Sequence, residues 1–425
     1  MSVQALHDTS DLKTQMQDVG ARARTAALAL ANADGASKTA ALTAAAATLR
    51  QRAEDLKQAN QADVDAAEGL SEALLDRLKL TDARIEGMAA GLETIAQLPD
   101  PVNATLAEWD RPNGLKIARV SVPIGVIGII YESRPNVTAD AGSLCLKAGN
   151  AAILRGGSES WHSSGVILEC LRAGLESAGL PADAVQRPPS ADRENVGYML
   201  AMPEHIDLIV PRGGKGLIQR VLENSRVPVL AHLEGINHTY VHASADVEQA
   251  VAVVHNAKLR RPGICGATET LLLDRAALET HLKPIVDDLT AAGCELRGDA
   301  AVCATDSRIA PATAADWDTE YLAPILTIGA VDGLDAAIQH INRHGTGHTE
   351  AILTSDETAA ERFGREVDAA ICMVNASTQF ADGGEFGMGA EIGIATGRLH
   401  ARGPVGAQQL TSYKYIVRGT GQTRP

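Results

Sequence analysis

Two kinds of hydrophobic pattern divide the chain. Residues 11–98 are rich in Ala and other helix formers, and apolar side chains between Leu70 and Ile95 recur at helical spacing, which predicts a helical layer. From Pro123 onward, short continuous apolar runs alternate with amphipathic segments. Such runs are typical of strands that are covered on both faces, so this alternation predicts parallel, doubly wound α/β sheets.

The alternation occurs twice, so we expect two α/β sections. In the first we expect strands at 125–130, 151–154, 206–210 and 227–233, with helices at 139–146, 162–178 and 217–224. The second begins near Gly235, with expected strands at 239–242, 270–273, 324–328, 351–354 and 371–375 and helices at 247–261, 275–292, 333–341 and 358–366.

The length also favours two domains, because 425 residues exceed one ordinary hydrophobic core. We expect a cofactor-binding domain made of residues 1–104 and 123–233, and a catalytic domain made of residues 234–385.

A different pattern lies between the helical layer and the first apolar run. Asn113-Gly114 separates two short alternating runs within residues 105–122, which is a strong signal for a β-hairpin. In the tail, Tyr413 and Tyr415 alternate with other residues. This pattern predicts a strand, which we expect to pair with the hairpin. An isolated hairpin is marginally stable, so residues 105–122 and 400–425 are predicted to form an oligomerisation arm of a homo-oligomer, a dimer or a tetramer.

Composition and charge narrow the classes of function. The formal net charge is -15, which disfavours nucleic acid and anionic membrane surfaces as partners. No apolar run approaches the ~20 residues that cross a bilayer. The six Cys are scattered without a C-x-x-C pair, which favours a reducing, cytoplasmic location. The spacings of His238 and His242, and of His340, His344 and His348, do not suit a shared ion, so no metal is predicted.

Cys265 is the candidate nucleophile. It lies in a Pro/Gly turn between a predicted helix and a predicted strand, where the thiol is not locked in a core. Arg260 and Arg261 lie just upstream, and their positive charge favours the thiolate, which is the reactive form. A small buried hydrophobe in a loop is the ordinary interpretation of any single Cys.

Two Gly-rich loops follow predicted strands, at the sheet edge where ligands of doubly wound folds bind. The loop Arg155-Gly156-Gly157-Ser158-Glu159 suits a dinucleotide, because Arg155 is able to meet a 2′-phosphate and Glu159 a ribose hydroxyl. The loop Arg212-Gly213-Gly214-Lys215 precedes a helix and suits phosphate through its amides and cations. Ordinary solvated turns are the alternative for both.

Several longer strings resemble the gamma-glutamyl phosphate reductases, a branch of the aldehyde dehydrogenase superfamily also called glutamate-5-semialdehyde dehydrogenases. They are residues 123–136 (ending Tyr-Glu-Ser-Arg-Pro-Asn), 144–150, 154–159, 210–216, 380–394 and 400–405. The resemblance runs from about residue 20 to 418. The chain departs from that branch's usual pattern at Gly266, at Leu259-Arg260 and at Asn237, where Asn, Thr-Gln and Cys are usual.

The resemblance implies a role for each matched position. Cys265 would be the nucleophile, and Asn136 with the Cys265 backbone N–H would form the oxyanion hole. Arg155 and Glu159 would hold the adenosine ribose and its 2′-phosphate side, the Arg212–Lys215 loop would lie near the cofactor's phosphates, and Glu320 would meet the nicotinamide ribose. Glu234 matches the superfamily's base. Arg134, Arg261 and Asn375 are candidates for the substrate's phosphate or carboxylate.

The implied reaction is NADPH-dependent reduction of L-glutamyl 5-phosphate to L-glutamate 5-semialdehyde through a Cys thioester, in proline biosynthesis. NADPH is favoured over NADH because of Arg155. The alternatives are another oxidoreductase of the superfamily, which the Arg-Pro-Asn136 string disfavours; a non-catalytic oligomeric or binding protein with this fold; and a kinase–reductase, for which the chain has no room.

Overall fold

The structure is a computed structural model that describes residues 3–424. The chain forms two compact units: unit 1 is made of Met1–Ala231, Gly387–Gly393 and Val405–Pro425, and unit 2 of His232–Phe386 and Ile394–Pro404. Residues 1, 2 and 425, at the ends of the predicted cofactor domain and arm, lie outside the described residues.

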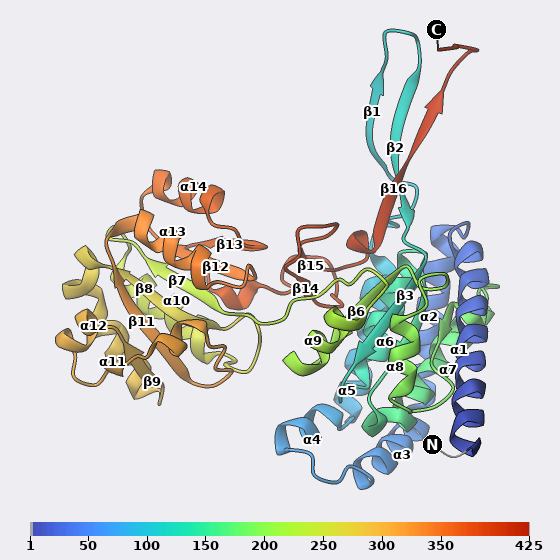
Figure 1. The fold of residues 1–425 in the computed structure, drawn as a ribbon, viewed down its shortest axis with the longest axis horizontal. Coiled ribbons are helices and arrows are strands. Elements are labelled where there is room, and N and C mark those ends of the chain that lie inside the picture. Colours follow the sequence, from blue (N-terminus) through green and yellow to red (C-terminus); the bar gives the residue numbers. More distant parts are fainter. Residues whose placement is uncertain (1–2, 425) are drawn as a thin grey trace. The chain divides into compact units, whose positions relative to one another are not determined.

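Unit 1 contains a four-stranded parallel sheet of order β5-β4-β3-β6, of which β3 and β6 are labelled in Figure 1. Its strands are β3 (Val126–Tyr131), β4 (Ala151–Arg155), β5 (Val185–Gln186) and β6 (Leu208–Arg212). Its helices are α1 (Val3–Leu30), α2 (Gly35–Gln51), α3 (Ala53–Asp65), α4 (Glu72–Leu78), α5 (Asp82–Gln97), α6 (Asn136–Lys147), α7 (Trp161–Ser177), α8 (Glu194–Leu200) and α9 (Lys215–Asn224).

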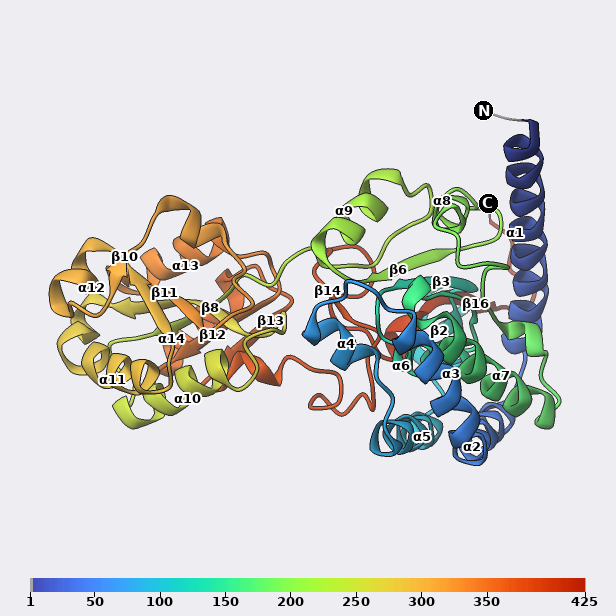
Figure 2. The same ribbon diagram turned by 90° about the horizontal axis from the view of Figure 1, so that it is seen from below.

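Helices cover both faces of this sheet, as its continuous apolar strands require. Buried side chains of α1, among them Met16 and Ala23, pack with those of β3, β4 and α8 on one face. On the other face α6 and α7 lie against each other, backed by the predicted helical layer of α2, α3 and α5, as Figure 2 shows from below. The helical pattern of residues 11–98 is therefore confirmed.

Unit 2 contains a seven-stranded parallel sheet of order β10-β9-β11-β8-β7-β12-β13. Its strands are β7 (Asn237–Val241), β8 (Thr268–Asp274), β9 (Glu295–Gly298), β10 (Ala310–Pro311), β11 (Ile325–Val331), β12 (Thr349–Leu353) and β13 (Ile371–Val374), with a separate antiparallel pair, β14 (Ile394–Ala395) and β15 (Gly403–Pro404). Its α-helices are α10 (Val247–Leu259), α11 (Lys283–Ala291), α12 (Ala300–Thr305), α13 (Gly333–His344) and α14 (Glu357–Glu366).

The buried clusters again fall on two faces. One joins α10 and α11 to β8 and β11, and the other joins α13 and α14 to β7 and β12. The prediction of two doubly wound parallel sheets is confirmed.

The arm has the predicted strands. β1 (Thr105–Asp110) and β2 (Lys116–Pro123) form the hairpin, and β16 (Thr411–Arg418) pairs antiparallel with β2 along its length. Gly114 has φ +84° in the turn, a backbone conformation that glycine adopts without a steric penalty. The expectation that the tail pairs with the hairpin is confirmed (Figure 1).

Two predicted elements differ from the structure, and strand β9 was missed. Residues 227–233 are not a strand: they make one isolated bridge, Ile209 with Val229, because Pro228 has no N–H to continue a ladder. Residues 275–292 are not one helix but a 3-10 turn, a π turn over Leu278–Leu282 and then α11, which restarts with Pro284 in its first turn. β9 was not predicted. Among the described residues, no helix is long and apolar enough to span a bilayer.

Candidate active site

Cys265 lies in the loop between α10 and β8 and is partly exposed, which confirms the predicted helix–loop–strand position. Burial disfavours the reactive thiolate at each of the other five thiols. Burial raises the pKa of Cys145 to about 12, that of Cys170, Cys294 and Cys372 to about 11, and that of Cys303 in the same direction. A raised pKa suppresses the nucleophilic thiolate, so none of those five is a good candidate nucleophile, and the partly exposed loop position of Cys265 keeps it as the candidate.

The backbone around Cys265 is fixed by a buried asparagine. Asn237 begins β7, which lies between β8 and β12 in the sheet. Its side-chain amide donates to the carbonyl oxygens of Cys265 (2.6 Å) and Ala267 (2.9 Å), and its side-chain oxygen accepts from the Thr349 N–H (3.2 Å). Asn237 therefore ties the nucleophile loop to two neighbouring strands.

Gly235 also explains how closely the chain approaches this loop. A Cβ atom at position 235 would lie 2.1 Å from the Cys265 carbonyl oxygen, so only glycine fits there. The Gly235 N–H donates to Glu320 Oε1 (3.0 Å). The structure thus brings Glu320 and the Glu234-Gly235 segment to the nucleophile loop.

A buried ion pair supports the Glu320 segment. Lys258, at the end of α10, binds Glu269 on β8, and both side chains are almost fully buried. Glu269 also accepts the Leu322 N–H (3.2 Å), and Leu322 has φ +52°. Burial raises the pKa of Glu269 to about 7, although Lys258 opposes this change.

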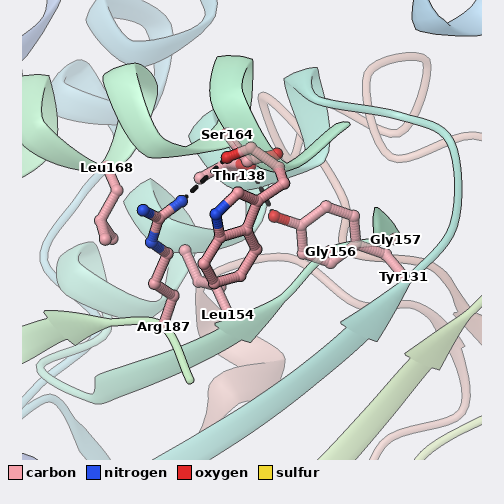
Figure 3. A pocket seen from close by; sticks show the side chains of 9 residues that line it. Tyr131, Thr138, Leu154, Gly156, Gly157, Ser164, Leu168 and Arg187 are labelled. Atoms are coloured by element: carbon pink, nitrogen blue, oxygen red, sulfur yellow. Dashed lines mark hydrogen bonds between the residues drawn. The ribbon is translucent and has the colours of Figure 1, made fainter. Parts of the chain in front are cut away.

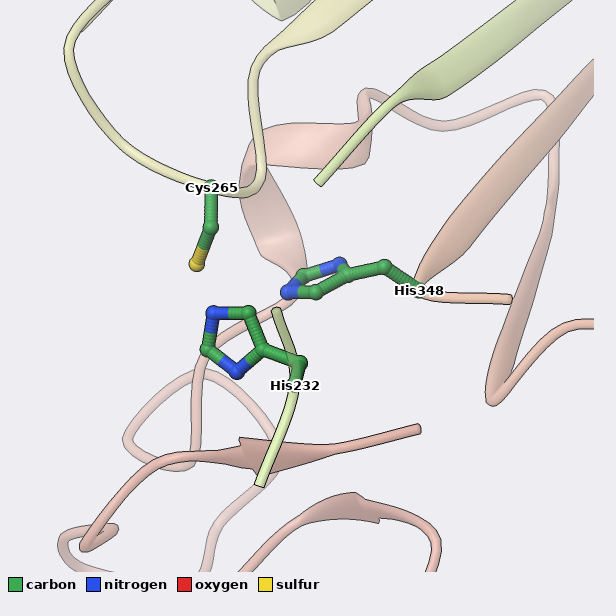
Figure 4. A group of neighbouring side chains, drawn as sticks. All are labelled: His232, Cys265 and His348. Carbon is green, nitrogen blue, oxygen red and sulfur yellow. The ribbon is translucent and has the colours of Figure 1, made fainter. Parts of the chain in front are cut away.

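Two histidines face the thiol, and sequence spacing did not reveal them. His232, His348 and Cys265 each place one ligand-type atom within 4.8 Å of the others, and Figure 4 shows the three side chains converging. His232 Nδ1 lies 2.7 Å from the Ile394 carbonyl oxygen. A carbonyl can only accept, so Nδ1 carries a proton, and in the neutral imidazole Nε2 then has the lone pair. His348 is fully buried, its Nε2 has no hydrogen-bond partner, and burial lowers its pKa to about 3.

In unit 1, Asn136 begins α6 at the position predicted for the oxyanion donor. Its side-chain amide donates to Asp140 Oδ2 (3.0 Å), one helical turn later. Burial raises the pKa of Asp140 to about 6, while the Asn136 hydrogen bond and the Arg212 charge oppose the change. One amide hydrogen of Asn136 is thus held by Asp140, and its second hydrogen is available to an oxyanion.

The loop after β4 has internal contacts at each predicted cofactor position. The Arg155 guanidinium donates to the carbonyl oxygens of Gly156 (2.8 Å) and Ala191 (3.0 Å), and its Nε is buried without a partner. Glu159 accepts the Ser133 N–H (2.7 Å) and hydroxyl (2.6 Å). Burial opposes ionisation of Glu159, yet these bonds lower its pKa overall. Ser158 is exposed at the start of a 3-10 turn, and Gly157 precedes it.

A pocket lies beside this loop (Figure 3). Tyr131 lines it, and a Cβ atom at Gly156 would lie 3.0 Å from the Tyr131 ring, so glycine permits this close packing. The Tyr131 hydroxyl bonds Thr138 Oγ1 (2.6 Å), and the Arg187 guanidinium lies 3.9 Å from the centre of the Trp161 ring. The pocket offers an apolar wall and a flat aromatic–guanidinium face.

The loop after β6 binds an anion from its own chain. Glu132 Oε2 accepts the Gly214 N–H (2.9 Å) at the N-terminus of α9, where Gly214 is the N-cap and Lys215 the first residue. Arg212 ends β6, and Gly213 follows it. The Gly214 N–H thus donates to a carboxylate, the kind of hydrogen bond that a phosphate also accepts at a helix N-terminus, and contact with a cofactor phosphate stays a prediction.

Three substrate candidates have different surroundings. Arg134 is partly buried in unit 1, whereas Arg261 is exposed in the nucleophile loop. Asn375 has φ +54°, and both ends of its side-chain amide bond the Thr354 backbone (2.9 Å each). Their contacts with substrate stay predictions, as do the oxyanion and cofactor contacts above.

Comparison with known proteins agrees with the fold. The profile of the aldehyde dehydrogenase family matches residues 9–303 and 309–414. The chain therefore belongs to that family, a class of oxidoreductases.

Within the family the similarity is specific. A gamma-glutamyl phosphate reductase from Rhodospirillum rubrum is 62% identical over 419 residues, 98% of each chain. The crystal structure of a gamma-glutamyl phosphate reductase from Thermotoga maritima has a TM-score of 0.94 at 44% identity and covers 97% of this chain and 100% of that one. The chain belongs to the gamma-glutamyl phosphate reductases. An engineered glycolyl-CoA reductase with bound NADP+ (TM-score 0.67, 16% identity, 94% and 96% covered) shares only the fold.

Proposed function

We propose that the chain reduces L-glutamyl 5-phosphate to L-glutamate 5-semialdehyde with release of phosphate, a step toward proline. The full-length identity with the Rhodospirillum rubrum reductase carries this proposal. The partly exposed Cys265 on its anchored loop supports it, because an acyl phosphate is reduced in a controlled way only after a nucleophile has captured the acyl group.

Cys265 acts as that nucleophile. His232 Nε2 keeps its lone pair toward the thiol and is the base at hand to take its proton. The thiolate attacks the acyl carbon, the bond from carbon to the phosphate oxygen breaks, and a thioester remains. After hydride adds to the thioester carbonyl, the carbon–sulfur bond breaks, which gives the aldehyde and returns the thiolate.

The developing oxyanion is stabilised by the Cys265 N–H and the Asn136 amide. Asp140 orients that amide, and Asn237 fixes the carbonyl of Cys265 and hence the loop. Glu234, the superfamily's base position, adjoins Gly235, which packs on the Cys265 backbone, so a role for it near the acyl group is consistent with its place.

NADPH supplies the hydride when it is bound. The residues present fit such a cofactor: the Gly214 N–H already holds a carboxylate at the N-terminus of α9, and Arg212 and Lys215 add positive charge there. Glu320 is the group for the nicotinamide ribose, and Glu159 for the adenosine ribose. Arg155 would meet a 2′-phosphate through its unpartnered Nε, once its guanidinium turns from the two carbonyls that it now binds.

The test is NADPH oxidation that depends on freshly generated glutamyl phosphate, with phosphate release followed alongside. Cys265→Ser should lower kcat on the order of 10³-fold or more, since it removes the nucleophile. Cys303→Ser, which changes a thiol on α12 outside the loop, is the matched control and should retain activity. An enzyme of the superfamily with another substrate would leave NADPH unoxidised and release no phosphate when glutamyl phosphate is added. Full turnover by Cys265→Ser would refute the thioester.

We also propose that the arm of β1, β2 and β16 joins copies of this chain into a homo-oligomer. β1 and β16 are the edges of its three-stranded sheet, and an unpaired edge is a template for another strand. Tyr413, Tyr415 and Val417 alternate along β16 and are each more than half exposed, so they offer an apolar row to a partner.

A further inference from the structure

The cluster of His232, Cys265 and His348 has the composition of a soft metal site. Imidazole and thiolate are the ligands that zinc prefers, and its protein sites are tetrahedral. The three residues come from distant parts of unit 2: the segment before β7, the loop before β8, and the residue before β12. We propose that this cluster binds one Zn²⁺, and that the bound ion withdraws the nucleophile from the reaction.

The distances suit zinc after a small movement. The three ligand atoms lie within 4.8 Å of one another, and the two imidazole rings stand nearly perpendicular with centroids 5.0 Å apart. A tetrahedral zinc ion with bonds of about 2.0 to 2.3 Å holds its ligands about 3.5 Å apart. Rotation of the partly exposed Cys265 and His232 side chains closes that difference, and solvent supplies the fourth ligand.

The outer contacts of both histidines favour metal binding. A ligating histidine usually donates its other ring N–H to a carbonyl or a similar acceptor, which fixes its tautomer and orientation. His232 Nδ1 meets the Ile394 carbonyl in this way, which leaves Nε2 toward the thiol (Figure 4). His348 Nδ1 lies 2.9 Å from Thr349 Oγ1, which similarly leaves Nε2 toward the cluster.

His348 supplies the independent argument. It is fully buried, and its Nε2 has no hydrogen-bond partner. A buried polar atom without a partner carries a free-energy penalty that a native structure rarely retains without a reason. A metal ion at the point where Nε2 aims would satisfy it.

The binding step is balanced by one proton. Zn²⁺ replaces the thiol hydrogen of Cys265 and accepts lone pairs from two neutral imidazoles, so one proton leaves for each ion bound and no electron is transferred. Sequence spacing predicted no metal because it compared histidines along single elements. The cluster of His232, Cys265 and His348 is instead assembled by the order of the strands in the sheet. The prediction that no metal binds and the proposal of a zinc site therefore exclude each other.

Direct metal binding by the full-length, metal-stripped protein tests the site, and it does not depend on the proposed reaction. Zinc affinity is measured by competition with a chromophoric chelator, and Co²⁺ is used to detect a thiolate-to-cobalt charge-transfer absorption. We expect one tight site, the absorption band, and protection of Cys265 from iodoacetamide by zinc. His232→Ala should weaken zinc by more than the roughly 10- to 100-fold that loss of an outer hydrogen-bond partner costs.

Two further variants keep the result interpretable. His255→Ala, which removes a half-exposed histidine on α10 that pairs with Asp288, is the control for adventitious binding and should leave the affinity unchanged. His348→Ala should weaken zinc as His232→Ala does. If His348→Ala fails to fold, the partly exposed His232 still decides the outcome.

Three results would overturn the site: no charge-transfer band, equal zinc affinity in wild type and His232→Ala, or an equal loss in His255→Ala. Inhibition of turnover, which rests on the proposed role of Cys265, is measured separately. Tight binding without inhibition would refute that role of the metal and leave the site, whereas an inactive enzyme with intact binding would point to the proposed function instead.

Discussion

Asp140→Asn should stabilise the protein in a way that depends on pH. Asp140 accepts from the Asn136 amide, and burial raises its pKa from the ordinary 3.8 to about 6. Ionising this carboxyl in the folded state is therefore unfavourable. Asn keeps a side-chain oxygen that accepts the same hydrogen bond, and it removes the charge.

The size of the expected stabilisation follows from the difference between the pKa of this carboxyl in the unfolded state and its pKa in the folded state. At about 1.4 kcal/mol per pH unit, the raised pKa corresponds to about 3 kcal/mol, and the partial exposure of Asp140 reduces this to about 1 to 2 kcal/mol. Between pH 3.8 and about 6 the unfolded state has released the proton and the folded state has not. Wild-type stability therefore falls as the pH rises through this window and is level above it.

The assay is urea unfolding of wild type and variant from about pH 4.5 to about pH 8. The variant should gain on the wild type as the pH rises to about 6 and keep a constant advantage of about 1 to 2 kcal/mol above it. Asp65→Asn, at an exposed carboxyl that ends α3, is the control and should show no such trend. An advantage that is independent of pH, or a loss of stability above pH 7, would contradict the assignment of a buried charge.

Three further outcomes are expected. Asn237→Ala leaves the Cys265 and Ala267 carbonyls without their donor and should lower the free energy of unfolding by about 3 to 5 kcal/mol in urea unfolding, together with kcat; a change below about 0.5 kcal/mol would be inconsistent with the anchor. Lys258→Met leaves the buried Glu269 carboxylate without its ion-pair partner and should lower the free energy of unfolding by about 3 to 5 kcal/mol in the same measurement. Adding Glu269→Leu should recover most of this loss, and no recovery would mean that the loss comes from altered packing. Tyr415→Glu should dissociate the oligomer in sedimentation equilibrium, whereas Lys414→Glu on the other face of β16 should not; an unchanged mass for both would exclude the arm.

The local sequence pattern determined which helices and strands form and in which order they follow one another along the chain. Continuous apolar runs gave the buried parallel strands, and Asn113-Gly114 gave the hairpin, because the periodicity of burial and the chemistry of turns depend on neighbouring residues. The same reasoning placed Cys265 in a loop between helix and strand. It was wrong at 227–233, where apolar residues around Pro228 looked like a strand but lacked a donor for the ladder.

Tertiary structure alone decided what surrounds the thiol. Residues 232, 265 and 348 are brought together because β7, β8 and β12 are neighbours in the sheet although they are far apart in the chain. The same strand order places Asn237 where it anchors the Cys265 loop. Pairing between distant strands depends on how whole layers bury their apolar faces, and no short stretch of sequence records that choice.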